Sequence, residues 1–195
     1  AKKNCDVREY PLGDTEKLIG SLSKYLKVPT SMIGIGNGSD QILDLILVNF
    51  LNKRTKILTS DPTFGFFEER CKLYSIPTIK IPFTEKMKLD VDKFIKKSKS
   101  ADLLYLDSPN NPTGFQFSKK DIQKLIKNFE GPVIIDEAYG DFGDYSLVEM
   151  AKKEKNLVVV RTFSKEFGLA GLRLGYFVAN KNFVDVFTRV IQYPY

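Results

Sequence analysis

The sequence predicts an α/β fold in which helices cover both faces of a mostly parallel central sheet, giving three layers. Helix-like and strand-like segments alternate along the chain, with no internal repeat and no low-complexity linker between them. Three strand-like segments, at residues 103–106, 133–135 and 157–160, are uninterrupted apolar runs. Such runs are typical of strands that are covered on both faces, as in parallel sheets. At 195 residues we expect one large domain over residues 1–195, or one domain of a longer protein.

The first half of the chain contains the signals for three helices and two strands. Residues 14–26 place their apolar side chains on one helical face. Residues 39–51 are apolar nearly all round, which predicts a buried helix. A short buried strand at 56–59 and a helix at 64–74 follow. Residues 76–83 are strand-like, but their two prolines indicate an edge strand or strand ends.

The second half continues this alternation between and after the apolar runs. Residues 118–129 carry Ile, Leu and Phe at helical spacing, and a second helix is expected at 145–153. Residues 172–178 alternate around glycine, which indicates a further strand. A final helix is expected at 183–191.

The composition excludes several kinds of function. The chain has no histidine, which removes Ser-His-Asp and Cys-His catalysis and zinc sites built on histidine. Cys5 and Cys71 lie far apart in the sequence, so we expect free thiols in a cytoplasmic protein and no metal site. No apolar run approaches the length of a membrane span, so no membrane partner is expected. The formal charge of +6 is scattered over helix faces, such as that of residues 93–97, so no nucleic-acid partner is expected either.

Polar motifs follow three of the expected strands. Residues 107–114 follow the first apolar run, residues 136–139 the second and residues 162–165 the third. A glycine-rich turn at 36–40 precedes the buried helix. Open α/β sheets bind ligands beyond the carboxyl ends of their strands, so we expect these distant segments to converge on one site.

The side chains in these motifs match what a lysine-bound pyridoxal phosphate requires. Lys165 would hold the aldehyde as a Schiff base and shuttle protons, and burial or a cationic neighbour would lower its pKa. Asp136 would keep the pyridine nitrogen protonated, although a turn aspartate would fit the same position. Asn111 and Tyr139 would donate hydrogen bonds to the ring hydroxyl oxygen, in a region where Asn, Pro and Gly also indicate a plain turn. Phe64 would stack on the ring, or it is a core aromatic.

The phosphate of this cofactor has an expected site at the start of the buried helix. The backbone N–H groups of Gly38, Ser39 and Asp40 would be free there, and the helix end is positive. Arg173 would pair with two phosphate oxygens at once. Two hydroxyl groups would add further bonds, those of Thr162 and Ser164. A turn followed by a helix cap would use the same glycines and the same Ser39 and Asp40.

These motifs resemble the large domain of fold-type I pyridoxal-phosphate aminotransferases and, among them, the histidinol-phosphate aminotransferases. The resemblance runs from about residue 8 to the end of the chain. Its most specific segments are 36–40, 61–64, 108–114, 136–139 and 162–176. It implies the cofactor pyridoxal 5'-phosphate, and it implies the roles given above for Lys165, Asp136, Asn111, Tyr139 and Arg173.

The resemblance also implies a reaction and an assembly. The reaction is amino-group transfer from histidinol phosphate to 2-oxoglutarate in histidine biosynthesis, so the partners are a small amino acid or amino alcohol phosphate and a 2-oxo acid. The family tyrosine that matches Tyr10 reaches the cofactor phosphate of the other subunit, which implies a homodimer. The position of Phe64 is usually tyrosine in the histidinol-phosphate group, so this chain loses a hydroxyl there and keeps the stacking ring.

The resemblance leaves other functions open. Family members have an N-terminal arm and a small C-terminal domain that do not match any part of this chain, so we expect it to fold and bind cofactor but to transaminate poorly. The same site would serve a decarboxylase of threonine phosphate or serine phosphate, or an aminotransferase of aromatic or other amino acids. A cofactor-binding or scaffolding domain without activity is a third alternative.

Overall fold

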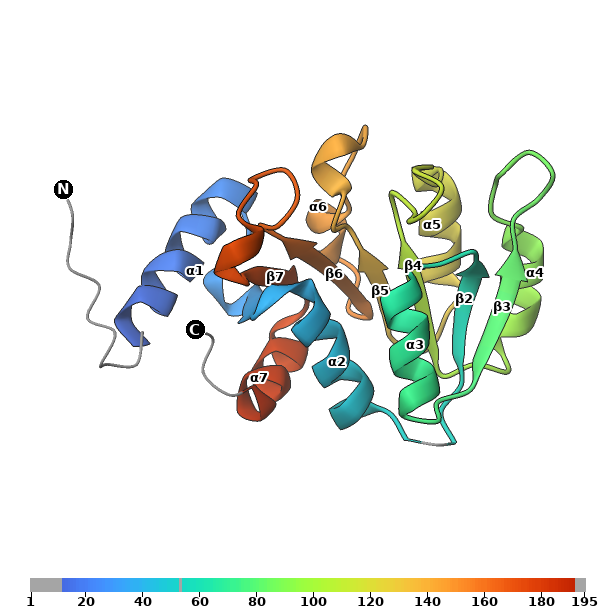
Figure 1. Ribbon diagram of the computed structural model, residues 1–195, viewed down its shortest axis with the longest axis horizontal. Coiled ribbons are helices and arrows are strands. Elements are labelled where there is room, and N and C mark those ends of the chain that lie inside the picture. The colour runs from blue at the N-terminus through green and yellow to red at the C-terminus, as the bar shows by residue number, and fades with distance from the viewer. Residues whose placement is uncertain (1–11, 53, 192–195) are drawn as a thin grey trace.

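The computed structural model describes residues 12–52 and 54–191, which form a seven-stranded sheet with helices on both faces (Figure 1). The strands are β1 (Ile33–Gly36), β2 (Ile57–Asp61), β3 (Thr78–Pro82), β4 (Leu103–Asp107), β5 (Val133–Asp136), β6 (Leu157–Thr162) and β7 (Gly175–Val178). The helices are α1 (Leu12–Leu26), α2 (Gly38–Phe50), α3 (Gly65–Leu73), α4 (Val91–Ser98), α5 (Lys119–Lys127), α6 (Val148–Ala151) and α7 (Lys181–Val190). Three 3-10 turns complete the set, η1 (Thr30–Met32), η2 (Gly140–Phe142) and η3 (Ala170–Leu172). The α/β fold expected from the sequence is confirmed.

The strand order is β1-β7-β6-β5-β4-β2-β3, and the sheet is mostly parallel. The pairs β2–β3, β2–β4, β4–β5 and β5–β6 are parallel. Only β7 runs antiparallel to its neighbours β6 and β1, so β1 runs in the same direction as the central strands. Strand β3 lies at the edge of the sheet, with Pro77 just before it and Pro82 as its last residue, so both alternatives expected from the prolines are met.

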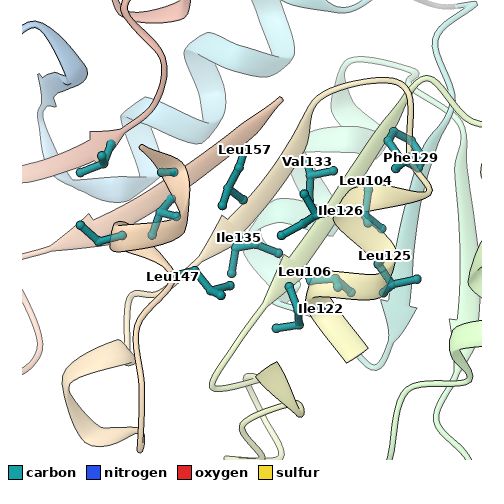
Figure 2. Close-up of a cluster of buried hydrophobic side chains, with 14 of the residues drawn as sticks. Leu104, Leu106, Ile122, Leu125, Ile126, Phe129, Val133, Ile135, Leu147 and Leu157 are labelled. Atoms are coloured by element: carbon teal, nitrogen blue, oxygen red, sulfur yellow. The ribbon is translucent and has the colours of Figure 1, made fainter. Parts of the chain in front are cut away.

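Two apolar cores lie on opposite faces of the sheet. Successive side chains of a strand point to opposite faces. Val133 and Ile135 therefore pack in one core with helices α4, α5 and α6, which Figure 2 shows in part. Ile134, from the same strand, packs in the other core with α2, α3 and α7. Burying a large apolar side chain contributes about 1.5–3 kcal/mol, which explains why the three apolar runs are the central strands of this fold.

Strand β1 was not expected from the sequence. Its residues are Ile-Gly-Ile-Gly, and the two glycines resemble part of the glycine-rich turn that follows. The structure gives the reason for the glycines. A Cβ at Gly34 would lie 2.2 Å from the ring of Phe177, and one at Gly36 would lie 2.6 Å from Ile42. The strand is therefore set by packing against Phe177, which is distant in sequence, and against Ile42 on the helix that follows.

The helix expected at residues 145–153 is shorter than predicted, since α6 covers only Val148–Ala151. The residues before it are used differently, because Leu147 N and the Ser146 hydroxyl both donate to the Glu137 carboxylate. The strand expected at 172–178 is also shorter. Leu172 belongs to η3, and Arg173 has a φ of 49°, in the left-handed region, so β7 begins only at Gly175.

Candidate active site

One cavity opens at the carboxyl ends of the central strands, beside the first turn of α2, and its volume is about 210 Å³. Segments far apart in the sequence contribute to its wall. The lining residues are Gly38, Ser39, Asp40, Phe64, Asp107, Pro109, Asn111, Asp136, Ala138, Tyr139, Thr162, Ser164, Lys165, Ala170 and Arg173. The structure thus brings together every site residue expected from the sequence except Tyr10, which lies outside the described residues. Their individual roles stay predictions.

The start of α2 forms one end of the cavity and has the features of an anion site. Gly38 begins the helix with a φ of +78°, a conformation that favours glycine. The first N–H groups of a helix have no partner within it, and the helix dipole is positive there. Strand β7 comes close to this end, since a Cβ at Gly175 would lie 2.5 Å from the backbone of Gly38 and Ser39. The contact holds the β7 segment, with Arg173 just before it, against the helix start.

Arg173 lies over this helix start. A Cβ at Gly38 would lie only 2.9 Å from Arg173 Nη2, so a side chain there would displace the guanidinium from its present position. The same nitrogen is 3.4 Å from Asp40 Oδ2, in an ion pair whose side chains are 53% and 42% exposed. Exposed pairs of this kind contribute little, about 0–1 kcal/mol. An incoming phosphate could therefore take over Arg173 at small cost.

Two hydroxyl groups stand near the same end of the cavity. Thr162 is the last residue of β6 and is buried. Its Oγ1 accepts a hydrogen bond of 3.1 Å from the backbone N of Ser164, which fixes the bend that follows the strand. Both residues line the cavity, and the Thr162 hydroxyl also donates to the Leu174 carbonyl oxygen at 3.5 Å, a long bond that it would give up to bind an anion.

Asp136 ends β5 on the cavity wall and is only 3% exposed. Its Oδ1 accepts from the backbone N of Ala138 at 2.9 Å, and its Oδ2 accepts from the Tyr105 hydroxyl at 3.1 Å. Burial, with a further contribution from the negative charge of Asp107, raises the pKa of Asp136 to about 7. A cationic group beside this carboxylate would stabilise its charged form and bring its pKa back towards the ordinary value. The position therefore favours a cationic partner.

Lys165 lies in the loop that joins β6 to η3. Its Nζ is 4.9 Å from the centre of the Tyr139 ring, which suits a cation–π contact. The loop is closed by a bond of 3.0 Å from Gly168 N to the Lys165 carbonyl oxygen. Lys165 itself is exposed. The burial that was expected around its amine is therefore not provided by the described residues.

Asn111 and Phe64 come from two loops on the other side of the cavity. Asn111 belongs to the turn after β4, and its backbone N donates to Asp107 Oδ2 at 2.6 Å. Phe64 immediately precedes α3, is half-buried and lines the cavity. A flat aromatic ligand could be stacked on one side by Phe64 and contacted at its edge by Asn111.

Several residues near the cavity were not singled out from the sequence. Pro109, Ala138 and Ala170 line it, and Tyr105 supports Asp136 from behind. The important omission is Asp107, a buried carboxylate that ends β4 and lies opposite Asp136 in the sheet. A signal was present, because Asp107 follows an apolar run just as Asp136 does.

A buried ionic group lies behind the Tyr139 segment and also escaped the sequence analysis. Arg161 Nη1 is 3.1 Å from Glu137 Oε2, and the two side chains are 5% and 1% exposed. The carboxylate of Glu137 also accepts from Ser146 Oγ at 2.6 Å and from Leu147 N at 2.7 Å. Burial raises the pKa of Glu137, while these bonds and the charge of Arg161 act to lower it. Arg161 further contacts Asp141 of η2, so this group joins β6 to the chain that follows Tyr139.

A metal centre and a membrane-spanning helix are both absent from residues 12–52 and 54–191. In these ranges no three His, Cys, Asp or Glu side chains are arranged to hold a metal ion. None of the described helices combines the length and the apolar character needed to cross a membrane.

The fold and the cavity together define an α/β domain with a cavity beyond the carboxyl ends of parallel strands, bordered by the start of a helix and by an arginine. Sequence comparison specifies it further. The chain belongs to the aminotransferase class I and II family, whose model matches residues 2–193.

Known proteins of this family resemble the chain along nearly all of its length. It is 38% identical to histidinol-phosphate aminotransferase of Thermoanaerobacter pseudethanolicus, over 99% of this chain and 55% of the relative. The histidinol-phosphate aminotransferase structure from Sinorhizobium meliloti, in complex with pyridoxal-5'-phosphate, superimposes with a TM-score of 0.89 at 22% identity, covering 96% of this chain and 53% of the other. The L-threonine-O-3-phosphate decarboxylase of Porphyromonas gingivalis gives 0.79 at 27% identity, covering 94% and 58%. The chain thus spans about half the length of the curated relatives it matches.

Proposed function

We propose that this chain is the pyridoxal-phosphate-binding large domain of an aminotransferase. In the whole protein, the reaction is amino-group transfer from histidinol phosphate to 2-oxoglutarate, a step of histidine biosynthesis. The observation that supports this most directly is that Lys165, Asp136 and Arg173 line one cavity, although they come from three different segments. The 38% identity to a histidinol-phosphate aminotransferase over 99% of the chain supports the choice of reaction.

The residues of the cavity fit the phosphate end of this cofactor. The free N–H groups at the start of α2 and the guanidinium of Arg173 would hold an anion between them. Thr162 and Ser164 would add hydroxyl donors from the end of β6. The lack of a side chain at Gly38 lets Arg173 lie over this end of the cavity, because a Cβ there would be 2.9 Å from Arg173 Nη2.

The residues also fit a pyridine ring. Asp136 would accept a hydrogen bond from the ring nitrogen and hold it in its protonated form. Asn111 and Tyr139 would donate to the ring hydroxyl oxygen, and Phe64 would cover one face of the ring. When bound, pyridoxal phosphate supplies an electron sink for the bonds of the substrate α-carbon. Lys165 would hold the cofactor through Nζ and, once released by the substrate amine, would move the proton of the α-carbon.

Assembly and location are also part of this proposal. Tyr10 would reach the cofactor phosphate of a second subunit in a homodimer. The cytoplasm is the proposed compartment, and the buried free thiol of Cys71 is compatible with it. The substrate carboxylate or phosphate would be bound mainly by parts of the longer protein that match nothing in this chain.

Decarboxylation of a phosphorylated amino acid is the second candidate. It is favoured by the 27% identity and the TM-score of 0.79 to an L-threonine-O-3-phosphate decarboxylase. The same lysine, aspartate and arginine would serve both reactions. The two differ in which bond of the α-carbon stands perpendicular to the ring.

Covalent labelling tests the site. The chain would be incubated with pyridoxal phosphate, reduced with borohydride and digested, and we expect the label on Lys165. Lys165→Ala should abolish the label, whereas Lys96→Ala, on the exposed face of α4, should leave it unchanged. A label on other lysines only, or none at all, would contradict the proposal and favour a scaffolding domain. Product analysis of the full-length protein, with histidinol phosphate and with threonine phosphate, would then separate the two enzymes.

A further inference from the structure

Asp107 and Asp136 place two buried carboxylates side by side in the cavity wall. They are partners in the parallel register of β4 and β5, so their side chains point to the same face of the sheet. Each is only 3% exposed, and both line the cavity. Burying two like charges together is costly unless they are well bonded or share a cation. The pair therefore requires an explanation beyond that of Asp136 alone.

The carboxylate of Asp107 connects two loops that are far apart in the sequence. Its Oδ1 accepts from the Thr63 hydroxyl at 2.9 Å. Its Oδ2 accepts from the backbone N of Asn111 at 2.6 Å and from Asn110 Nδ2 at 3.1 Å. Asn110 Nδ2 also donates to the Pro62 carbonyl oxygen at 3.2 Å, so the two loops are bonded to each other as well.

These two loops carry the two side chains that would contact the cofactor ring. Thr63 is adjacent to Phe64, which would cover the ring face, and Asn111 would donate to the ring oxygen. The buried carboxylate of Asp107 therefore fixes the separation between the loop that carries Phe64 and the loop that carries Asn111. The three donors to Asp107 are uncharged, so its negative charge is not neutralised by any of them.

We propose, given the pyridoxal-phosphate binding inferred above, that Asp107 is a positioning residue with two effects. It holds the Phe64 and Asn111 loops at the separation that the ring requires. Its charge also adds to that of Asp136 in favouring the protonated, cationic form of the bound cofactor. The charge that burial makes costly in the free chain is then balanced when the cationic ring is present. In agreement with this, burial raises the pKa of Asp107.

Two variants separate the effects of position and charge. Asp107→Asn removes the charge. Depending on its orientation, the new amide places either its N–H₂ group or its neutral oxygen, a weaker acceptor, against the Asn111 N–H. Thr63→Val removes one donor and keeps the charge. We expect Asp107→Asn to weaken pyridoxal-phosphate binding about 10- to 100-fold, which corresponds to losing a hydrogen bond to a charged group. Thr63→Val should weaken binding less, by about tenfold or below.

The second measurement is the pH at which the visible absorbance of the bound cofactor changes. A negative charge stabilises the cationic form, so its removal in Asp107→Asn should lower this pH by about one unit, the low end of the effect of a neighbouring charge. Thr63→Val should not move it. Asp92→Asn, which removes a 91% exposed carboxylate on α4, should change neither the affinity nor the pH.

The outcomes are distinct. If the unaltered chain does not bind pyridoxal phosphate at Lys165, the proposed function fails, and the role of Asp107 fails with it. If the unaltered chain binds but Asp107→Asn has the same affinity and the same transition pH, only the role of Asp107 is overturned. If Asp107→Asn does not fold, as judged by circular dichroism, Thr63→Val decides, and unchanged affinity in that variant overturns the positioning.

Discussion

Replacing Arg161 with methionine should cost this fold a large part of its stability. The change leaves Glu137 buried without its cation, and Asp141 loses the same partner. Breaking a buried pair by removing one partner costs about 3–5 kcal/mol, because the remaining charge is uncompensated. A native domain has only about 5–15 kcal/mol of net stability. The bonds from Ser146 and Leu147 would remain and limit the loss, so we expect about 3 kcal/mol.

Urea unfolding followed by circular dichroism would measure this loss, with linear extrapolation to water. The double variant Arg161→Met with Glu137→Gln should recover most of the stability, since the amide still accepts from Leu147 N and carries no charge. Lys124→Met breaks an exposed ion pair with Asp92 and should cost less than about 1 kcal/mol. A loss below about 1 kcal/mol for Arg161→Met would refute the reasoning. So would a double variant that is less stable than the single one.

Three further changes test the geometry of the cavity. Gly175→Ala forces a backbone shift at the start of α2, so it should lower the free energy of unfolding by about 1–3 kcal/mol and weaken pyridoxal-phosphate binding. Gly171→Ala has open space around it and should change neither quantity in unfolding and binding assays. Arg173→Lys keeps the charge but loses the planar fork, so binding should weaken about tenfold or more in a titration while the urea midpoint stays unchanged. Tyr105→Phe removes the hydroxyl that donates to Asp136. It should lower the free energy of unfolding by about 1.5–3 kcal/mol at pH 8 and by less at pH 5.5. An equal loss at both pH values would contradict this role of the hydroxyl.

The sequence predicts the central sheet well, because its apolar runs can be buried only between two helical layers. Strands β4, β5 and β6 follow from those runs, and the edge position of β3 agrees with the prolines around it. Strand β1 could not be predicted, since Gly34 is explained by the side chain of Phe177, which pairs with it in the sheet from a distant part of the sequence.

The polar part of the site is predictable to a similar degree. The segments that line the cavity were foreseeable, since each polar motif follows a strand and parallel strands end at one edge. The pairing of Glu137 with Arg161 was not foreseeable, because it joins the residue just after β5 to a residue of β6, and no local pattern relates the two. The exposure of Lys165 also lies beyond local sequence, since it depends on which surfaces cover the loop after β6.

Asp136 links the stability of the free chain to its proposed function. Its pKa of about 7 in the folded chain exceeds the ordinary value of about 3.9, so the folded state binds the proton more tightly than the unfolded state does. Protonation therefore stabilises the fold, and this stabilisation is lost as pH rises from about 4 to about 7. The difference is on the order of 4 kcal/mol at pH 8.

Asp136→Asn should for this reason be more stable than the unaltered chain at pH 8 when no cofactor is present. The amide keeps an oxygen for Ala138 N, and its N–H₂ can donate to the Tyr105 hydroxyl. Near pH 4 the two chains should be equally stable, because the carboxyl group is then largely neutral in the folded chain. With pyridoxal phosphate the order should reverse, since only the carboxylate gains a cationic partner and ligand binding stabilises by mass action. Thermal unfolding at both pH values, with and without the cofactor, measures these stabilities. If Asp136→Asn is less stable than the unaltered chain at pH 8 without cofactor, the buried charge of Asp136 is not costly.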